Sequence, residues 1–130
     1  MRCFVIMPIG DPQRDHRLFE KSQDIYCNWI KPAVESTYSR DGKILSCHRA
    51  DVELRPGDIV QDIIAELVTA DVVIADLSGR NPNVFYEFGI RHATNNSTIL
   101  LAEGAEHIPF DVHSQQTIIY EYTPPGMLNL

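Results

Sequence analysis

The sequence contains no apolar run long enough to cross a membrane, and it is poor in residues that bind metals or form disulfides. Its 3 cysteines, Cys3, Cys27 and Cys47, are widely spaced and include no C-x-x-C pair. Each is expected to be a small buried hydrophobic residue in a reducing compartment, not half of a disulfide. The 5 histidines are scattered singly. We therefore expect no metal and no other cofactor.

Positive charge is also scarce, because 11 lysines and arginines face 18 acidic residues and leave a net charge of −7. This balance argues against a broad electrostatic grip on nucleic acid or on an anionic membrane. A small anionic ligand, bound by local amides and one arginine, is compatible with it. With 130 residues, 44% of them hydrophobic, the chain is expected to form one domain spanning 1–130. Its start, MRCFVIMPIG, lacks a signal-peptide pattern, which predicts a cytoplasmic protein.

Short apolar runs alternate with segments of helical periodicity along the chain. The runs predict buried strands, and they lie at 3–10, 44–50, 71–77, 97–103 and 116–122. A helix is expected over 17–38, where Pro32 should kink or divide it. A second helix over 55–70 begins with Asp58 and Gln61 in a capping-box pattern, and a third begins at Asn81 and Pro82.

This alternation predicts an α/β fold of the flavodoxin-like or Rossmann-like kind, a three-layer sandwich with helices on both faces of a parallel sheet. We expect five strands in the order 2-1-3-4-5. Segment 104–114 has room for a short helix at most, and the proline-rich tail 123–130 is too short to close the fold with another helix. The fifth strand is therefore expected to be less covered than the others. A partner subunit would cover it.

Ligands of such sheets bind beyond the carboxyl ends of the strands, near the point where the strand order reverses. Asp76 lies at the end of the third predicted strand. The helix that starts at Asn81 would direct free backbone amides toward the same edge, with Arg80 beside them as a phosphate clamp. Glu87 follows one to two turns later.

Plain structural roles account for the same residues. Glu87 and Arg91 are spaced i,i+4 in the favourable order and would form an exposed ion pair. Asp76 would cap a turn. Pro8 and Gly10 would only shape a loop. Asn81 and Pro82 would only start the helix, and Arg80 would be an exposed side chain in contact with solvent.

The segment ADVVIADLSGRNPNVFYEFGIRHA resembles the core of the nucleoside 2-deoxyribosyltransferase superfamily, with the 2'-deoxynucleoside 5'-phosphate N-hydrolases as the nearest functional parallel. Those families share an ADVV-A-[DE] strand, a polar loop and a Y-E-[L/F]-G helix that bears a nucleophilic glutamate. Toll/interleukin-1 receptor (TIR) domains, some of which hydrolyse NAD, have a related fold. The chain also looks like bacterial TIR-like proteins of antiviral defence systems.

The resemblance implies roles for individual residues. Glu87 matches the nucleophile, Tyr86 and Gly89 its flanks, and Gly10 the glycine that approaches the nucleotide. Asn81 falls where the transferases have an aspartate and the phosphate hydrolases a serine, and Asp62 falls within one residue of another family aspartate. A first-loop tyrosine of the transferases has no counterpart. The substrate-binding set implied in this way is Pro8, Gly10, Asp62, Ser78, Arg80, Asn81, Asn83 and Tyr86.

The function implied is cleavage or transfer of the N-ribosyl bond of a nucleotide, such as NAD or a (deoxy)nucleoside monophosphate. Glu87 would stabilise or attack the oxocarbenium-like centre at C1', while Phe85, Tyr86 and Phe88 exclude solvent around it. Asp76 would protonate a leaving purine or pyrimidine, and nicotinamide, already cationic, would need no acid. Amides at 81–84, with Arg80, would hold a 5'-phosphate.

Two other classes of function are compatible with the sequence. One is a non-catalytic nucleotide-binding or signalling module that works as an assembly, and in either case we expect a homo-oligomer such as a dimer. The other is a flavodoxin-like electron carrier, although the loop MPIGDPQRD lacks the serines and threonines that bind the phosphate of FMN. The residues do not distinguish hydrolysis from transfer.

Overall fold

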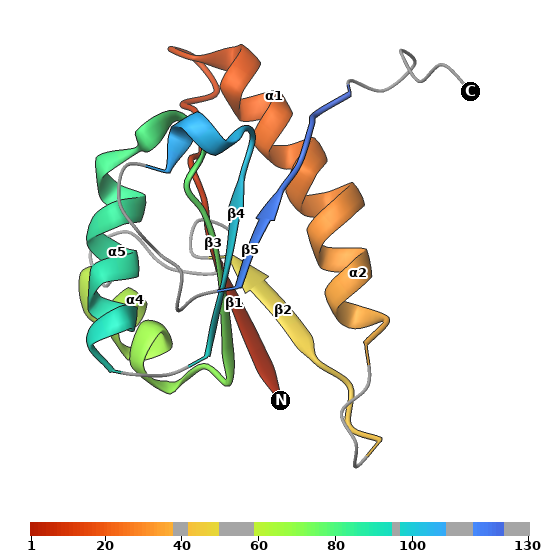
Figure 1. The fold of residues 1–130 in the computed structure, drawn as a ribbon, viewed down its shortest axis with the longest axis vertical. Helices are drawn as coiled ribbons and strands as arrows, with labels where there is room; N and C mark the ends of the chain where they lie inside the picture. The colour runs from red at the N-terminus through yellow and green to blue at the C-terminus, as the bar shows by residue number, and fades with distance from the viewer. Residues whose placement is uncertain (38–41, 50–58, 95–96, 109–115, 124–130) are drawn as a thin grey trace.

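A parallel five-stranded sheet forms the centre of the protein, whose computed structural model describes residues 1–37, 42–49, 59–94, 97–108 and 116–123 (Figure 1). The strands are β1 (Arg2–Ile6), β2 (Ser46–Arg49), β3 (Val72–Asp76), β4 (Thr98–Ala102) and β5 (Gln116–Ile119). All neighbouring pairs are parallel, and the order is β2-β1-β3-β4-β5. The predicted order and the predicted Rossmann-like fold class are both confirmed.

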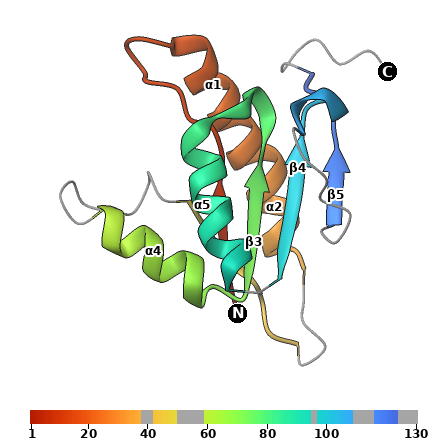
Figure 2. The same ribbon diagram turned by 60° about the vertical axis from the view of Figure 1, so that its left-hand side comes forward.

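Helices cover both faces of the sheet, as the alternation of elements predicted. One face carries α1 (His16–Asp24), η1 (Ile25–Ile30) and α2 (Lys31–Glu35), which run as one continuous rod. The other face carries α4 (Ile59–Thr69) and α5 (Pro82–Ala93), seen in front of the sheet in Figure 2. Right-handed crossovers between parallel strands place the helices in these two layers.

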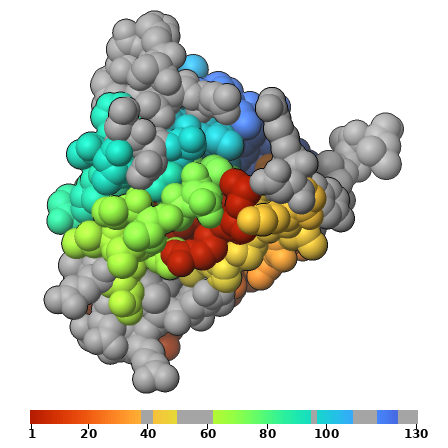
Figure 3. Space-filling model, turned by 90° about the horizontal axis from the view of Figure 1, so that it is seen from below, coloured from red at the N-terminus to blue at the C-terminus, as the bar shows by residue number. Residues whose placement is uncertain are grey.

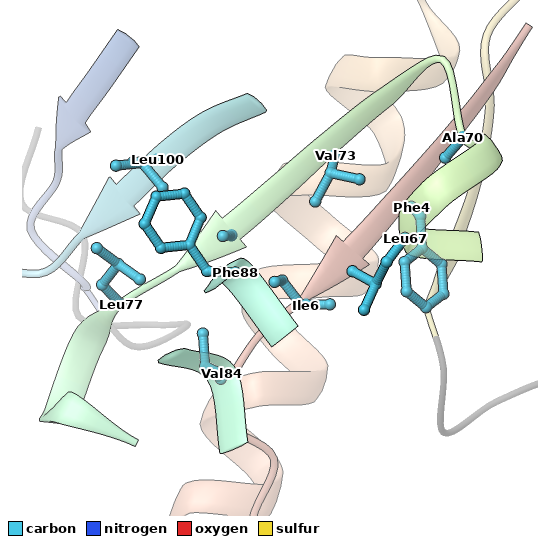
Figure 4. Packing of buried hydrophobic residues seen from close by; sticks show 10 residues of the cluster. Phe4, Ile6, Leu67, Ala70, Val73, Leu77, Val84, Phe88 and Leu100 are labelled. Atoms are coloured by element: carbon cyan, nitrogen blue, oxygen red, sulfur yellow. The ribbon is translucent and has the colours of Figure 1, made fainter. Parts of the chain in front are cut away.

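Each face of the sheet has its own core because strand side chains alternate between the faces. The cluster under α4 and α5 is drawn in Figure 4, where Phe88 of α5 lies against Leu100 of β4. The cluster under α1, η1 and α2 contains Cys3, Val5, Met7, Ile25, Tyr26, Ile30, Cys47 and Ile74. Burial on both faces explains why the central strands read as unbroken apolar runs.

The helix predicted over 17–38 is neither kinked nor divided at Pro32. Its backbone stays in the helical region through Ile30 and Lys31, and Pro32 lies in the first turn of α2. The irregularity lies just before, where η1 is a π-helical segment. Proline lacks an amide hydrogen and crowds the carbonyl four residues earlier, and a wider turn relieves both problems without a sharp bend.

On the other face, α5 begins as its sequence indicates, and α4 buries an apolar side chain against the sheet. The side chain of Asn81 accepts hydrogen bonds from the amides of Asn83 and Val84 at 2.9 and 3.3 Å, which confirms it as the cap of α5. Leu67 of α4 is fully buried. The predicted cap of α4, Asp58, lies outside the described residues.

Two expectations about the rest of the chain had different outcomes. The described part of the segment after β4, residues 103–108, contains the short helix η3 (Ala105–His107), and Ile118 and Ile119 of β5 are 53% and 49% exposed. The fifth strand is thus poorly covered, as predicted. Cys27, by contrast, is exposed on η1, so the expectation that every cysteine is buried was wrong. It lies on the solvent side of that segment, two residues before the partly buried Trp29.

Arg91 joins the last turn of α5 to the amino edge of the sheet. Its guanidinium is buried and donates to the carbonyls of Leu67, Ala70 and Ser97 at 2.8–2.9 Å, and more weakly to Asp71 at 3.4 Å. These carbonyls belong to the end of α4 and to the segments that enter β3 and β4. Figure 3 looks onto this edge, with the start of β1 in red beside α4 and the segment leading into β2.

We predict that Arg91→Met lowers the free energy of unfolding by roughly 2–5 kcal/mol, because buried carbonyls lose their donors. Arg91→Lys should also be destabilising, since one ammonium group cannot reproduce the planar fork. Urea denaturation measures both. The matched control is Arg17→Met in the exposed first turn of α1, expected within about 0.5 kcal/mol of the native protein. Equal effects at positions 17 and 91 would contradict this role for Arg91.

Candidate functional site

The carboxyl edge of the sheet brings together segments that follow four of the five strands. Pro8 and Gly10 follow β1, Ser78 follows β3, Glu103 follows β4, and Tyr120 follows β5. The segment after β2, residues 50–58, lies outside the described residues. In a parallel sheet these positions are neighbours because all strands end at the same edge.

Asp76, the last residue of β3, is 1% exposed and accepts three hydrogen bonds. Its Oδ1 accepts from the amide of Ser78 at 3.0 Å and from the Ser78 hydroxyl at 2.5 Å. Its Oδ2 accepts from the Tyr120 hydroxyl at 2.7 Å. The Ser78 hydroxyl also accepts from the amide of Glu103 at 2.8 Å. Asp76 thus caps the turn after β3, which is the simpler of the two roles that the sequence allowed.

A cleft of about 150 Å³ opens beside this network, and we call it the carboxyl-edge cleft. Its lining residues are Met7, Pro8, Leu18, Lys21, Ser22, Ile25, Asp76, Ser78, Gly79, Glu103, His107 and Tyr120. Lys21 and Glu103 form an ion pair across it. The amide of Gly79 donates to Nδ1 of His107 at 3.0 Å. Desolvation, and then the charge of Asp76, raise the pKa of Tyr120, so its hydroxyl stays protonated.

Several of these residues were missed by sequence reasoning. Tyr120 follows the fifth predicted strand, and the rule that strand ends share one edge would have placed it beside Asp76. Lys21 and His107 carried no such signal. Lys21 extends to the carboxyl edge of the sheet from α1. His107 belongs to η3, and the residues of η3 do not predict where that segment lies in the fold.

Glu87 is half-buried in α5, and burial raises its pKa to about 7. It does not pair with Arg91, whose guanidinium is turned to backbone carbonyls, so the exposed i,i+4 ion pair is wrong as an interpretation. Among the residues that the structure describes, Glu87 has no hydrogen-bond or ion-pair partner. A sheltered carboxylate without compensation is costly and is a frequent mark of a functional site.

The aromatic neighbours of Glu87 in sequence do not surround it in space. Phe88 packs into the core against the sheet, and Tyr86 is 67% exposed. Successive residues of a helix are turned by about 100°, so the flanking side chains leave α5 in other directions. Glu87 is sheltered by its place beside the buried face of α5, one turn before Arg91. Tyr86 and Phe88 therefore do not form the predicted aromatic shell around Glu87.

The structure does not bring Asp76 and Glu87 onto one face of the sheet. Asp76 has the same orientation as Ile74, which packs under η1, and its partner Tyr120 packs against Trp29. Glu87 lies on α5, on the opposite face. Any ligand that touches both carboxylates has to cross the rim of the sheet.

Two of the amides that the sequence analysis assigned to a phosphate already have acceptors. Asn83 and Val84 donate to the Asn81 side chain, and Pro82 has no amide hydrogen. Arg80 is exposed, but its guanidinium donates to the carbonyl of Glu106 at 2.8 Å and so links η2 (Ser78–Arg80) to η3. The start of α5 is therefore closed by its own residues.

The other residues predicted to bind substrate differ in their structural surroundings. Gly10 is needed for packing, because a Cβ there would lie 2.5 Å from the amide nitrogen of Phe19 and 2.6 Å from the carbonyl oxygen of Asp15. Pro8 lines the carboxyl-edge cleft. Asp62 is exposed on α4. Within the described residues, no group of three or more histidine, cysteine or acidic side chains could hold a metal ion, and no helix is long and apolar enough to span a membrane.

No family model and no curated protein matches the sequence. Among solved structures, the fold is similar to that of a 2-desoxiribosyltransferase from Leishmania mexicana, with a TM-score of 0.54 and 16% sequence identity. The similarity covers 79% of this chain and 65% of the other, so the chain spans less than two thirds of that enzyme. At this identity the similarity shows a shared fold.

We predict that Glu87→Gln stabilises the protein above pH 7. The pKa of Glu87 is about 7 in the folded state and about 4.5 when unfolded, so ionisation costs stability as the pH rises between these values. The variant should gain roughly 1–3 kcal/mol near pH 8 and lose this advantage below about pH 4.5. Urea denaturation across this range measures it, with Glu35→Gln on α2 as an exposed control. A destabilised Glu87→Gln at pH 8 would show that the carboxylate has a stabilising partner.

Proposed function

We propose that the protein cleaves or transfers the N-glycosidic bond of a nucleoside or nucleotide, with Glu87 as the nucleophile. The observation that carries this proposal is the sheltered carboxylate of Glu87 on α5, whose pKa is raised by burial and which has no partner in the part of the chain that the structure describes. The fold shared with a solved 2-desoxiribosyltransferase supports it, as does the resemblance of segment 70–93 to that superfamily. A structural role is a poor account of Glu87, because burial without a partner destabilises the ionised form.

The reaction proposed for Glu87 is a displacement at the anomeric carbon. The carboxylate attacks C1', the bond from C1' to the base nitrogen breaks, and its electron pair leaves with the base. Water or a second base then attacks C1' and releases Glu87, giving hydrolysis or transfer respectively. A sheltered site strengthens the attraction between the carboxylate and the developing cation. Both outcomes use the same residue.

The contacts of Asp76 disfavour it as the proton donor for the leaving base. It accepts three hydrogen bonds, so its role in this network is that of an acceptor. A cationic leaving group such as nicotinamide needs no proton, and its release from NAD is the simplest reaction for this arrangement. Deoxynucleosides and their monophosphates would take a proton from solvent.

A second candidate function is nucleotide binding without turnover, in a homo-oligomer. The exposed Ile118 and Ile119 on β5 favour this possibility, since a second subunit would remove them from water. On this proposal the chain works as a cytoplasmic dimer whose carboxyl edge holds a nucleotide. Binding without release of a base would distinguish it from catalysis.

We predict that the native protein releases free base from at least one substrate in a panel of NAD, deoxynucleosides and deoxynucleoside monophosphates. Glu87→Gln should reduce the rate by at least about 100-fold, because the amide cannot form the glycosyl-enzyme ester. Chromatography of the released base measures the rate. Glu35→Gln, which changes an exposed carboxylate on α2, should leave it unchanged. Undiminished base release by Glu87→Gln would exclude Glu87 as the nucleophile.

We also predict that kcat/KM rises with pH and levels off above about pH 7. The nucleophile must be ionised, and burial raises the pKa of Glu87 to about 7. Below that value, kcat/KM should fall by about tenfold for each pH unit. Initial rates of base release at several pH values test this, with Glu35→Gln expected to give the same curve. A rate that falls as the pH rises through 7 would instead indicate that Glu87 donates a proton.

A further inference from the structure

The carboxyl-edge cleft lies at the reversal point of the strand order. β1 stands between β2 and β3, so the connections that leave β1 and β3 run toward opposite sides of the sheet. Met7 and Pro8 enter the cleft from the first connection, and Asp76 and Ser78 from the end of β3 and its turn. Divergence of neighbouring connections opens a crevice at this point in parallel sheets.

The walls of the cleft combine an apolar side with a polar end. Met7, Leu18 and Ile25 provide the apolar side, and Asp76, Ser78 and Tyr120 the polar end. A small flat ring with a polar edge matches such a surface. The volume of about 150 Å³ matches a single ring, because a cavity of about that volume in another protein accommodates one benzene ring. Two fused rings would not be fully enclosed.

The polar end offers an acceptor. A carboxylate has about four lone-pair positions. Among the residues that the structure describes, Oδ1 of Asp76 receives two donors, the amide and hydroxyl of Ser78, while Oδ2 receives only the Tyr120 hydroxyl. One position on Oδ2 therefore remains for a further N–H group. The donors already present hold the carboxylate in place, so a ligand would meet a pre-oriented acceptor.

We propose that the carboxyl-edge cleft binds a single six-membered nitrogen heterocycle through an N–H group that donates to Asp76. The ligand class is a pyrimidine with an exocyclic amine or a pyridine carboxamide, and purines are disfavoured by size. The proposal rests on the proposed function only in treating this ring as the leaving base of the substrate. The sugar attached to such a base would then cross the rim of the sheet toward the face that carries Glu87.

Titration of the full chain with free nicotinamide, cytosine and adenine tests this inference, with calorimetry or ligand-observed nuclear magnetic resonance as the readout. We expect nicotinamide or cytosine to bind with a Kd in the millimolar range or tighter, and adenine to bind about tenfold more weakly. Asp76→Asn should weaken binding about tenfold or more, because an amide group replaces the free acceptor. Failure of both single-ring compounds to bind the native protein, or equal binding of adenine, overturns the proposal.

A second variant keeps the test decisive if Asp76→Asn does not fold. Leu18→Trp would fill the apolar side of the cleft from α1 and leave the Asp76 contacts intact, so it should abolish binding, whereas Leu18→Met should not. Unchanged binding by Leu18→Trp overturns the proposal. Glu87→Gln separates the two proposals, since it should stop turnover while nicotinamide or cytosine still binds. Turnover without binding of a free ring would overturn the cleft assignment alone.

Discussion

The structure depends on one constraint, which is that a parallel sheet must be covered on both faces. Each strand is followed by a crossover that returns the chain to the same starting edge, so every carboxyl end lies at the opposite edge. Helix packing uses the faces and leaves that edge to the loops. As a result, Asp76 and Tyr120, 44 residues apart, are joined by a hydrogen bond. Candidate functional residues gather there because the loops at this edge take no part in covering the sheet.

The two acidic residues near this edge differ in how their charge is balanced. Asp76 is the more deeply buried, yet three donors compensate its charge. Glu87 is only half-buried, yet nothing among the described residues compensates it, and its pKa rises to about 7. Natural proteins tolerate such a cost where function requires a reactive group. Burial alone would therefore single out Asp76, whereas the balance of donors singles out Glu87.

Much of the fold could be predicted from the sequence, because local patterns carry it. The apolar run that became β3 has no polar alternation, and only a strand covered on both faces needs that composition. Asn81 and Pro82 likewise predicted the start of α5, because both residues are favoured at the beginning of a helix. Such features follow from a few neighbouring residues. The structure contains them almost as predicted.

The predictions that failed concern contacts between distant segments or the direction of side chains. Arg91 was expected to meet Glu87 four residues away, but the carbonyls of α4 and β4 provide a better site for its guanidinium. The aromatics beside Glu87 were expected to shelter it, although helix geometry sends Tyr86 and Phe88 elsewhere. Neither of these outcomes is determined by sequence spacing.

The contacts of Arg91 affect which parts of the domain can move. By binding carbonyls from α4 and from the entrances to β3 and β4, it makes the amino edge of the sheet stiff. Local opening of a protein starts where buried contacts are fewest, so fluctuations should concentrate at the opposite edge. The domain can then adjust its loops around a guest molecule while the register of its strands stays constant. A single cation at the end of α5 would separate the adaptable half of the molecule from the rigid one.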